Sequence, residues 1–215
     1  MAGTGTHESR WAGQLFACMQ DFAARRTNAV MLILADIDRP EPGRRYPEAG
    51  LEFAGHRWRA FYHCHDADVQ HPQEHGHFHI FTDTGKQHWA HVAGLSIDRS
   101  GQPLQWFAVN RWVTGSPWFA REELLRQLGD RQDRDSSPVG CWLFALLQLY
   151  RSTLTELLTR RDEQVRQHAL HQERTAVLED PAIYTLATLP VELQSMLEKH
   201  LLSRAEITND TGQTV

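Results

Sequence analysis

The sequence predicts an α+β fold, in which an antiparallel four-stranded meander sheet is covered on one face by N-terminal and C-terminal helices. Apolar residues recur at helical spacing near both ends of the chain. Between these ends, residues 51–113 contain four short segments that are rich in aromatic and β-branched residues and are separated by Gly, Asp, Ser and Pro. The chain has 215 residues, a length typical of one domain. We therefore expect residues 1–215 to form a single domain.

An N-terminal helical section is expected over residues 8–37. Its apolar residues Trp11, Leu15, Met19 and Phe22 are spaced by three or four positions, which places them on one face of a helix. The run AVMLILADI that follows fits a second helix or a buried strand, because periodicity does not separate the two. The next stretch, DRPEPGRRYPEAG, has three prolines and two glycines and is expected to be a loop.

The sheet is expected over residues 51–113, with one strand from each of the four segments. The segment sequences are LEFAGHRWRAFYHCHD, HGHFHIFTD, HWAHVAGLSID and PLQWFAVNRWV. The last two are joined by DRSGQP, in which Asp98 and Ser100 can bond nearby backbone groups and Gly101 can adopt a positive φ. This turn chemistry predicts a hairpin, and the four strands together predict an antiparallel meander.

A C-terminal helical section is expected over residues 117–203. It opens with SPWFAREELLRQLGD, whose Ser-Pro start is typical of a helix N-terminus. A long helix is expected from Pro138 to about Leu178, apolar at its start and polar towards its end, and this helix is the candidate surface for homo-oligomerisation. The stretch PVELQSMLEKHLLSR predicts a last short helix, and residues 204–215 predict a frayed tail.

Composition argues against several classes of partner. The formal net charge is −5 and the pI is near 6.2, so the chain lacks the excess of Lys and Arg that phosphate backbones require. No apolar stretch reaches the roughly 18 to 20 residues of a membrane span. The three cysteines are odd in number and widely spaced, which encodes neither a disulfide framework nor a thiolate zinc site. We expect a cytoplasmic protein that acts on a small molecule and binds neither nucleic acid nor membrane.

Histidines are concentrated in the predicted sheet, where nine of the 13 lie between His56 and His91. Side chains alternate along a strand, so the three histidines of EHGHFHIF share one face of their strand, and the two of YHCHD share one face of theirs. A register that sets His63 opposite His77 would place all five imidazoles on one surface, unless a bulge intervenes. Of His88 and His91, which are three positions apart, only one can face the same way.

Such a surface predicts a divalent metal site for Fe or Zn, because imidazole with an occasional carboxylate is a ligand set that both metals accept. The outer histidines of the HxHxH segment are about 13 Å apart along an extended strand, so all three cannot share one ion comfortably. A pair from this strand with one histidine of the preceding strand is the expected set, and His77 belongs to every version. The candidate ligands are His63, His65, His75, His77 and His79.

The same site has three candidate catalytic residues. Glu74 could bind the metal, fix the tautomer of a ligand histidine or act as a general base. His77 lies at the centre of the cluster, and Arg111 is a candidate clamp for an anionic group, with a surface salt bridge as its alternative role. The function that follows is a metal-dependent enzyme with a small-molecule substrate, either a non-haem iron oxidoreductase or a zinc hydrolase. A non-catalytic metal-binding or interaction protein is an alternative.

Two resemblances bear on this site. The segment HGHFHIF resembles the signature of the histidine-triad family, which implies a metal-free nucleotide hydrolase or transferase. In that family's chemistry the central histidine, here His77, would attack the α-phosphate, and His75 and His79 would support it. The longer stretch from RAFYHCHDADVQHPQEHGHFHIF to AVNRWVTG resembles an uncharacterised bacterial family, a domain of unknown function with an EHGHFH segment. This second resemblance covers most of the chain and implies no activity.

Overall fold

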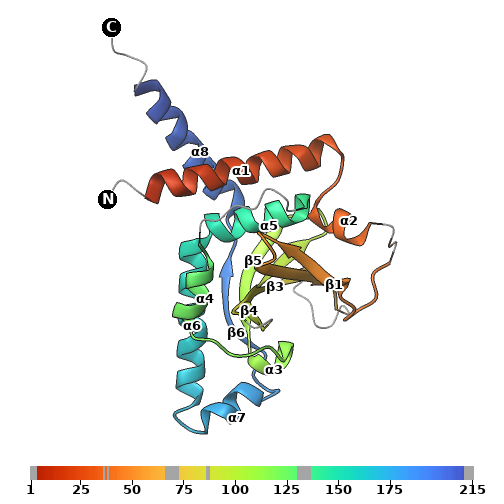
Figure 1. Cartoon of the computed structure of the whole chain (residues 1–215), viewed down its shortest axis with the longest axis vertical. Helices are drawn as coiled ribbons and strands as arrows, with labels where there is room; N and C mark the ends of the chain where they lie inside the picture. Colours follow the sequence, from red (N-terminus) through yellow and green to blue (C-terminus); the bar gives the residue numbers. More distant parts are fainter. Residues whose placement is uncertain are drawn as a thin grey trace.

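The computed structural model describes residues 4–35, 37, 39–65, 73–85, 88–129 and 137–210, with residues 4–6 and 203–210 described as backbone only. Six strands form one antiparallel sheet in chain order (Figure 1). Helices precede the first five strands, and further helices lie before and after the sixth. The α+β class and the antiparallel meander are therefore confirmed, whereas the sheet has six strands and not the four expected. The strands are β1 (Tyr46–Phe53), β2 (Trp58–His63), β3 (Glu74–Asp83), β4 (Trp89–Asp98), β5 (Pro103–Val109) and β6 (Thr185–Pro190).

The two additional strands have separate causes. The first predicted strand is a hairpin, because the chain turns between Phe53 and Trp58 with three consecutive residues at positive φ, at positions 54–56. This turn separates β1 from β2. At the other end, β6 lies within a section predicted to be helical, where TLATLP pairs with β5 and buries Leu186, Ala187 and Leu189. A strand of six residues that lies far from its partner in the sequence gives a weak local signal.

The helices follow the predicted sections with different boundaries. Residues 29–34 of the ambiguous run form a helix, whose first turn is capped by the Asn28 side chain accepting from the amide of Met31 at 2.8 Å. The long helix predicted from Pro138 is three helices, and the predicted tail from residue 204 is helical to Asp210; residues 211–215 lie outside the described part. The helices are α1 (Thr4–Ala24), α2 (Ala29–Leu34), α3 (Arg111–Thr114), α4 (Arg121–Gln127), α5 (Pro138–Leu149), α6 (Arg151–His168), α7 (Arg174–Glu179) and α8 (Leu193–Asp210).

The core lies between one face of the sheet and α5. Ten of the 12 residues of α5 are buried, because the sheet packs on one side of this helix and α1 packs on the other (Figure 1). The helix is apolar all round, as expected for an element buried on both sides. From the sheet, the even-numbered side chains of β2, and those of β3 from Gly76 onwards, lie on the core side, among them Trp58, Tyr62, Phe78 and Ile80. The odd-numbered side chains of β2, and those of β3 from His77 onwards, therefore point to the opposite face.

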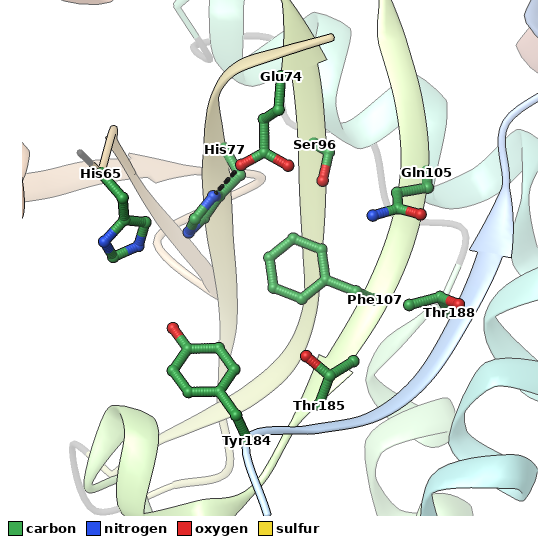
Figure 2. A pocket seen from close by; sticks show the side chains of 9 residues that line it. All are labelled: His65, Glu74, His77, Ser96, Gln105, Phe107, Tyr184, Thr185 and Thr188. Atoms are coloured by element: carbon green, nitrogen blue, oxygen red, sulfur yellow. Dashed lines mark hydrogen bonds and ion pairs between the residues drawn. The ribbon is translucent and has the colours of Figure 1, made fainter. Parts of the chain in front are cut away.

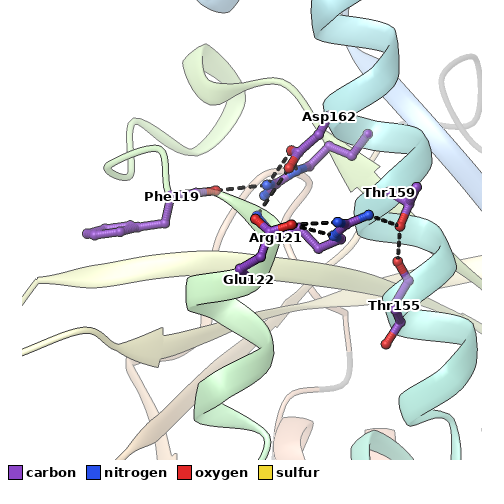
Figure 3. A network of polar contacts seen from close by, with 7 residues as sticks. Phe119, Arg121, Glu122, Thr155, Thr159 and Asp162 are labelled. Carbon is purple, nitrogen blue, oxygen red and sulfur yellow. Dashed lines mark hydrogen bonds and ion pairs between the residues drawn. The ribbon is translucent and has the colours of Figure 1, made fainter.

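A polar network fixes the segment between α3 and α4 against α6. The guanidinium of Arg161, which is 4% exposed, donates to the carbonyl of Phe119 at 2.8 Å and to Asp162 at 2.6 Å. Asp162 also accepts from the backbone amide of Arg121 at 3.1 Å (Figure 3). In the same segment, Ser116 accepts from the backbone amide of His91 at 3.3 Å. The network therefore holds this segment beside the histidine-bearing face.

Within the described ranges, no helix has both the length and the apolar character that crossing a bilayer requires.

Gly94 sets how closely one aromatic ring approaches the histidine-bearing face. A Cβ at this position would lie 2.0 Å from the Phe107 ring, which packs over Gly94 and edge-on against His77 at 5.1 Å between centroids. Gly94→Ala is therefore expected to lower the free energy of unfolding by about 1–3 kcal/mol and to displace this ring. Urea unfolding measures the loss. Gly129→Ala is the control, because a Cβ there meets nothing within 4 Å; equal stability of the two variants would contradict the prediction.

Candidate metal centre

Cross-strand register brings the histidines of β2 and β3 together. His63 is directly opposite His77, as expected from the alternation of the two strands. His65 follows two residues after His63, just beyond the end of β2, and its ring centroid is 4.6 Å from that of His63 and 5.1 Å from that of His77. One ligand nitrogen from each of these three imidazoles lies within 4.8 Å of the others. We call His63, His65 and His77 the histidine triplet.

The triplet has nearly the spacing that a bound ion requires. The Nε2 atoms of His63 and His77 are 2.6 Å apart. Two nitrogens that bind a tetrahedral zinc ion at about 2.0–2.1 Å are roughly 3.4 Å apart, so a relative shift of about 1 Å would admit the ion. Burial, followed by the charges of His77 and His65, lowers the pKa of His63 to about 3. The imidazole of His63 is therefore neutral at physiological pH, which is the form that binds metals.

Glu74 orients His77. The Oε1 atom of Glu74 accepts a hydrogen bond from Nδ1 of His77 at 2.6 Å, and the two side chains are only 8% and 6% exposed. Burial alone would raise the pKa of the Glu74 carboxyl, but the hydrogen bond from His77 and its charge outweigh burial and lower it. An ionised carboxylate only accepts, so Nδ1 of His77 carries a proton and Nε2 is left to face the other two histidines. This carboxylate–histidine arrangement is common behind metal-bound imidazoles.

A β-bulge separates His75 from the triplet. The register between β3 and β4 shifts between Glu74 and Gly76, so Glu74 points to the histidine-bearing face and His75 does not. Nδ1 of His75 instead lies 2.6 Å from the hydroxyl of Tyr62, on the core side of the sheet. The expectation that His75 shares a face with His77 is therefore wrong, because one extra residue reverses the alternation.

His79 lies beside the triplet but pairs with another histidine. Its Nδ1 is 2.9 Å from Nε2 of His91, and its ring centroid is 5.0 Å from those of His63 and His77. Burial, followed by the charges of neighbouring histidines, lowers the pKa of His79 well below its ordinary value. Burial, followed by the charge of Arg161, lowers the pKa of His91 to about 3. His79 is thus adjacent to the candidate centre without belonging to the triplet. The sequence predicted that either His88 or His91 would face the other histidines, and in the structure His91 does.

Arg111 lies outside the centre. It was expected on the fourth predicted strand, but that strand, now β5, ends at Val109, and Asn110 caps the short helix α3. The Arg111 guanidinium forms an ion pair with Glu179 of α7, both partly exposed to solvent. Its surface salt bridge, the alternative role considered above, is the arrangement observed. His71, one of the nine clustered histidines, falls outside the described residues.

A pocket of about 190 Å³ opens beside the triplet (Figure 2). Its walls come from the end of β2, from β3, β4 and β5, and from the residues at and before β6. Apart from Glu74, the sequence did not identify the non-histidine residues that line the pocket. Three of them, at and before β6, belong to a section that was predicted to be helical. The lining residues are His65, Glu74, His77, Ser96, Gln105, Phe107, Tyr184, Thr185 and Thr188.

Glu74→Gln is expected to weaken metal affinity by about 10- to 100-fold, because an amide no longer holds His77 by a charge-assisted hydrogen bond. Competition with a chromophoric chelator measures the affinity. Glu52→Gln is the matched control, since Glu52 also contacts a histidine Nδ1, that of His56 at 2.8 Å, but on the surface. An unchanged affinity for Glu74→Gln, or an equal loss in both variants, would contradict the assigned role.

Comparison with known proteins gives a family and no activity. A family model described as "Domain of unknown function (DUF6969)" matches residues 9–191 of the chain. No curated protein and no solved structure matches. The match covers the sheet and every residue of the centre, and it ends before α8.

Proposed function

The chain belongs to the DUF6969 family of domains of unknown function, and we propose that it is a metal-dependent enzyme whose histidine triplet holds one divalent ion, Fe(II) or Zn(II). The observation that carries the proposal is the convergence of three imidazole nitrogens within 4.8 Å of one another beside a pocket. One of the three, on His77, is oriented by a buried carboxylate. Three protein ligands with a position left for water or substrate are typical of catalytic metal sites, whereas structural zinc sites use four.

The reaction class depends on the metal. A zinc ion with three nitrogen ligands lowers the pKa of a bound water and supports hydrolysis, and an iron ion supports oxidation or oxygenation. His65 and His77 both line the pocket, so an ion on the triplet would be reachable from it. Glu74 is assigned as the residue that fixes the tautomer of His77, which leaves the pocket as the place where a small-molecule substrate meets the ion.

The metal-free alternative, with His77 as a nucleophile towards a nucleotide phosphate, has less support. The hydrogen bond to Glu74 would leave Nε2 of His77 available for attack. However, no Lys or Arg is among the residues that line this pocket in the described part of the chain. A nucleotide phosphate needs charged donors of this kind. We also propose a cytoplasmic location, which suits a chain with only three cysteines, Cys18, Cys64 and Cys141, odd in number and widely spaced.

Elemental analysis of the purified untagged protein tests the proposal, after expression in medium supplied with iron, zinc, copper and manganese. We expect about one equivalent of a single metal, bound by three imidazoles. Cobalt(II) is then substituted, and azide is added while the visible absorption is recorded. A spectral change with azide would support an open position, and an unchanged spectrum would favour a non-catalytic site. A folded protein that stays free of metal on titration would overturn the proposal.

A further inference from the structure

The pocket beside the triplet carries little charge besides its histidines. Among the described residues that line it, Glu74 is the only carboxylate, and none is a Lys or Arg. A bound divalent ion would be partly balanced by this carboxylate. Away from the ion, a carboxylate or phosphate of a ligand would find no Lys or Arg among the described lining residues to pair with. That part of the pocket therefore suits an uncharged group better than an anionic one.

The wall of the pocket formed by β5 and by the residues at and before β6 offers side-chain hydrogen-bonding groups that the protein itself does not use. Within the described residues, the side chains of Gln105, Tyr184, Thr185 and Thr188 make no hydrogen bond to another protein group. An amide both donates and accepts, and hydroxyls do the same. Burial, followed by the charge of Glu74, raises the pKa of the Tyr184 phenol, which therefore remains a donor at neutral pH. These groups suit a ligand with several oxygen or amide groups.

The lining also restricts the size and orientation of a ligand. The Phe107 ring lies between the histidines on one side and Gln105 and Thr188 on the other, and the Tyr184 hydroxyl points towards the space beside His65 and His77 (Figure 2). A ligand over this ring could contact the ion and the amide together. The volume of about 190 Å³ limits the ligand to a small molecule.

From this placement we infer that the site selects a small, uncharged hydroxy-amide or hydroxy-carbonyl compound, which Gln105 and Tyr184 orient over Phe107 beside the ion. The inference rests on the proposed metal function, because the ion supplies the other end of the ligand's binding site. It adds the chemical class of the substrate and two specificity-determining residues. The hydroxyl of such a ligand would lie at the ion, and its amide or carbonyl would lie at Gln105.

Mandelamide and mandelate are the probes, since they have the same number of non-hydrogen atoms and differ in the charge of one group. Binding to the metal-loaded protein is measured by isothermal titration calorimetry. We expect mandelamide to bind at least about tenfold more tightly than mandelate, because in this orientation the carboxylate would lie at Gln105, away from the ion and without a Lys or Arg among the described lining residues. Gln105→Leu and Tyr184→Phe are each expected to weaken mandelamide binding by about three- to tenfold, the effect of one lost hydrogen bond.

Two control variants accompany the test. Gln167→Leu removes an exposed amide at the end of α6, and Tyr150→Phe removes a phenol in the core, so neither is expected to change probe binding. Tighter binding of mandelate, no binding of either probe to the loaded protein, or unchanged binding in both pocket variants would each overturn the inference. A protein that takes up no metal fails at the elemental analysis, before any probe is added, so failure of the proposed function is distinguished from failure of this inference.

Discussion

His77→Ala is expected to reduce the bound metal from about one equivalent to background, because His77 is the proposed ligand that both β-sheet register and Glu74 hold in place. His63→Ala is expected to have nearly the same effect, since its Nε2 lies 2.6 Å from that of His77. His75→Ala is the informative comparison. His75 lies only two residues from His77, yet its side chain contacts Tyr62 on the core side of the sheet, so this variant should keep its metal.

Metal content is measured by elemental analysis on each purified variant, beside circular dichroism as a check on folding. His171→Ala, at an exposed position after α6, controls for the loss of any histidine. Loss of metal from His75→Ala with retention in His77→Ala would show that the triplet is not the site. Retention of metal in all of these variants would place the ion elsewhere in the chain.

The metal-free protein is expected to lose about 4 kcal/mol of its free energy of unfolding between pH 7.5 and pH 5, from His79 and His91 alone. Both side chains are at most 9% exposed, and their pKa values in the folded protein are well below the ordinary value of about 6.5, that of His91 at about 3. Above pH 6.5 neither state binds these protons, so stability is unaffected. Below it the unfolded chain takes up two protons that the folded chain does not, which costs about 1.4 kcal/mol per pH unit for each histidine.

Urea unfolding at pH 7.5 and pH 5 in the presence of a chelator measures this loss. A variant with both His56→Gln and His171→Gln is the control, because both histidines are exposed and the loss should persist without them. His91→Leu is expected to reduce the pH slope by about 1.4 kcal/mol per pH unit, whatever its effect on stability at pH 7.5. Equal stability of the wild-type protein at the two pH values would contradict the assignment of neutral, buried histidines.

The parts of the site that sequence predicted depend on short-range geometry. Alternation along β2 and β3, with a connection short enough for antiparallel pairing, sufficed to place His63 opposite His77. For Glu74 the sequence left three roles open, and the hydrogen bond to His77 favours the one that fixes the tautomer of a histidine. Arg111 was misplaced because the end of a strand is among the least certain features of a sequence pattern.

The errors have a common cause in contacts between distant residues. A Cβ on Gly76 would lie 2.4 Å from the Tyr62 hydroxyl, so the close packing of this pair, together with the contact of His75 to Tyr62, accompanies the bulge. Nothing within EHGHFH itself signals that packing. Likewise, β6 is recognisable as a strand chiefly through its pairing with β5. That pairing brings Tyr184, Thr185 and Thr188 to the pocket.

The sequence by itself therefore determined the α+β class, the antiparallel meander and the gathering of histidines on one face, because these follow from the periods of apolar and polar residues along each segment. Beyond the pairing of His63 with His77, tertiary structure decided where the other histidines lie, because it turned His75 away and brought His91 to His79. It also completed the pocket with Gln105 and Tyr184, which are 79 positions apart in the sequence. The physical reason is that a one-residue bulge or a newly paired edge strand changes side-chain direction through packing, which periodicity does not encode.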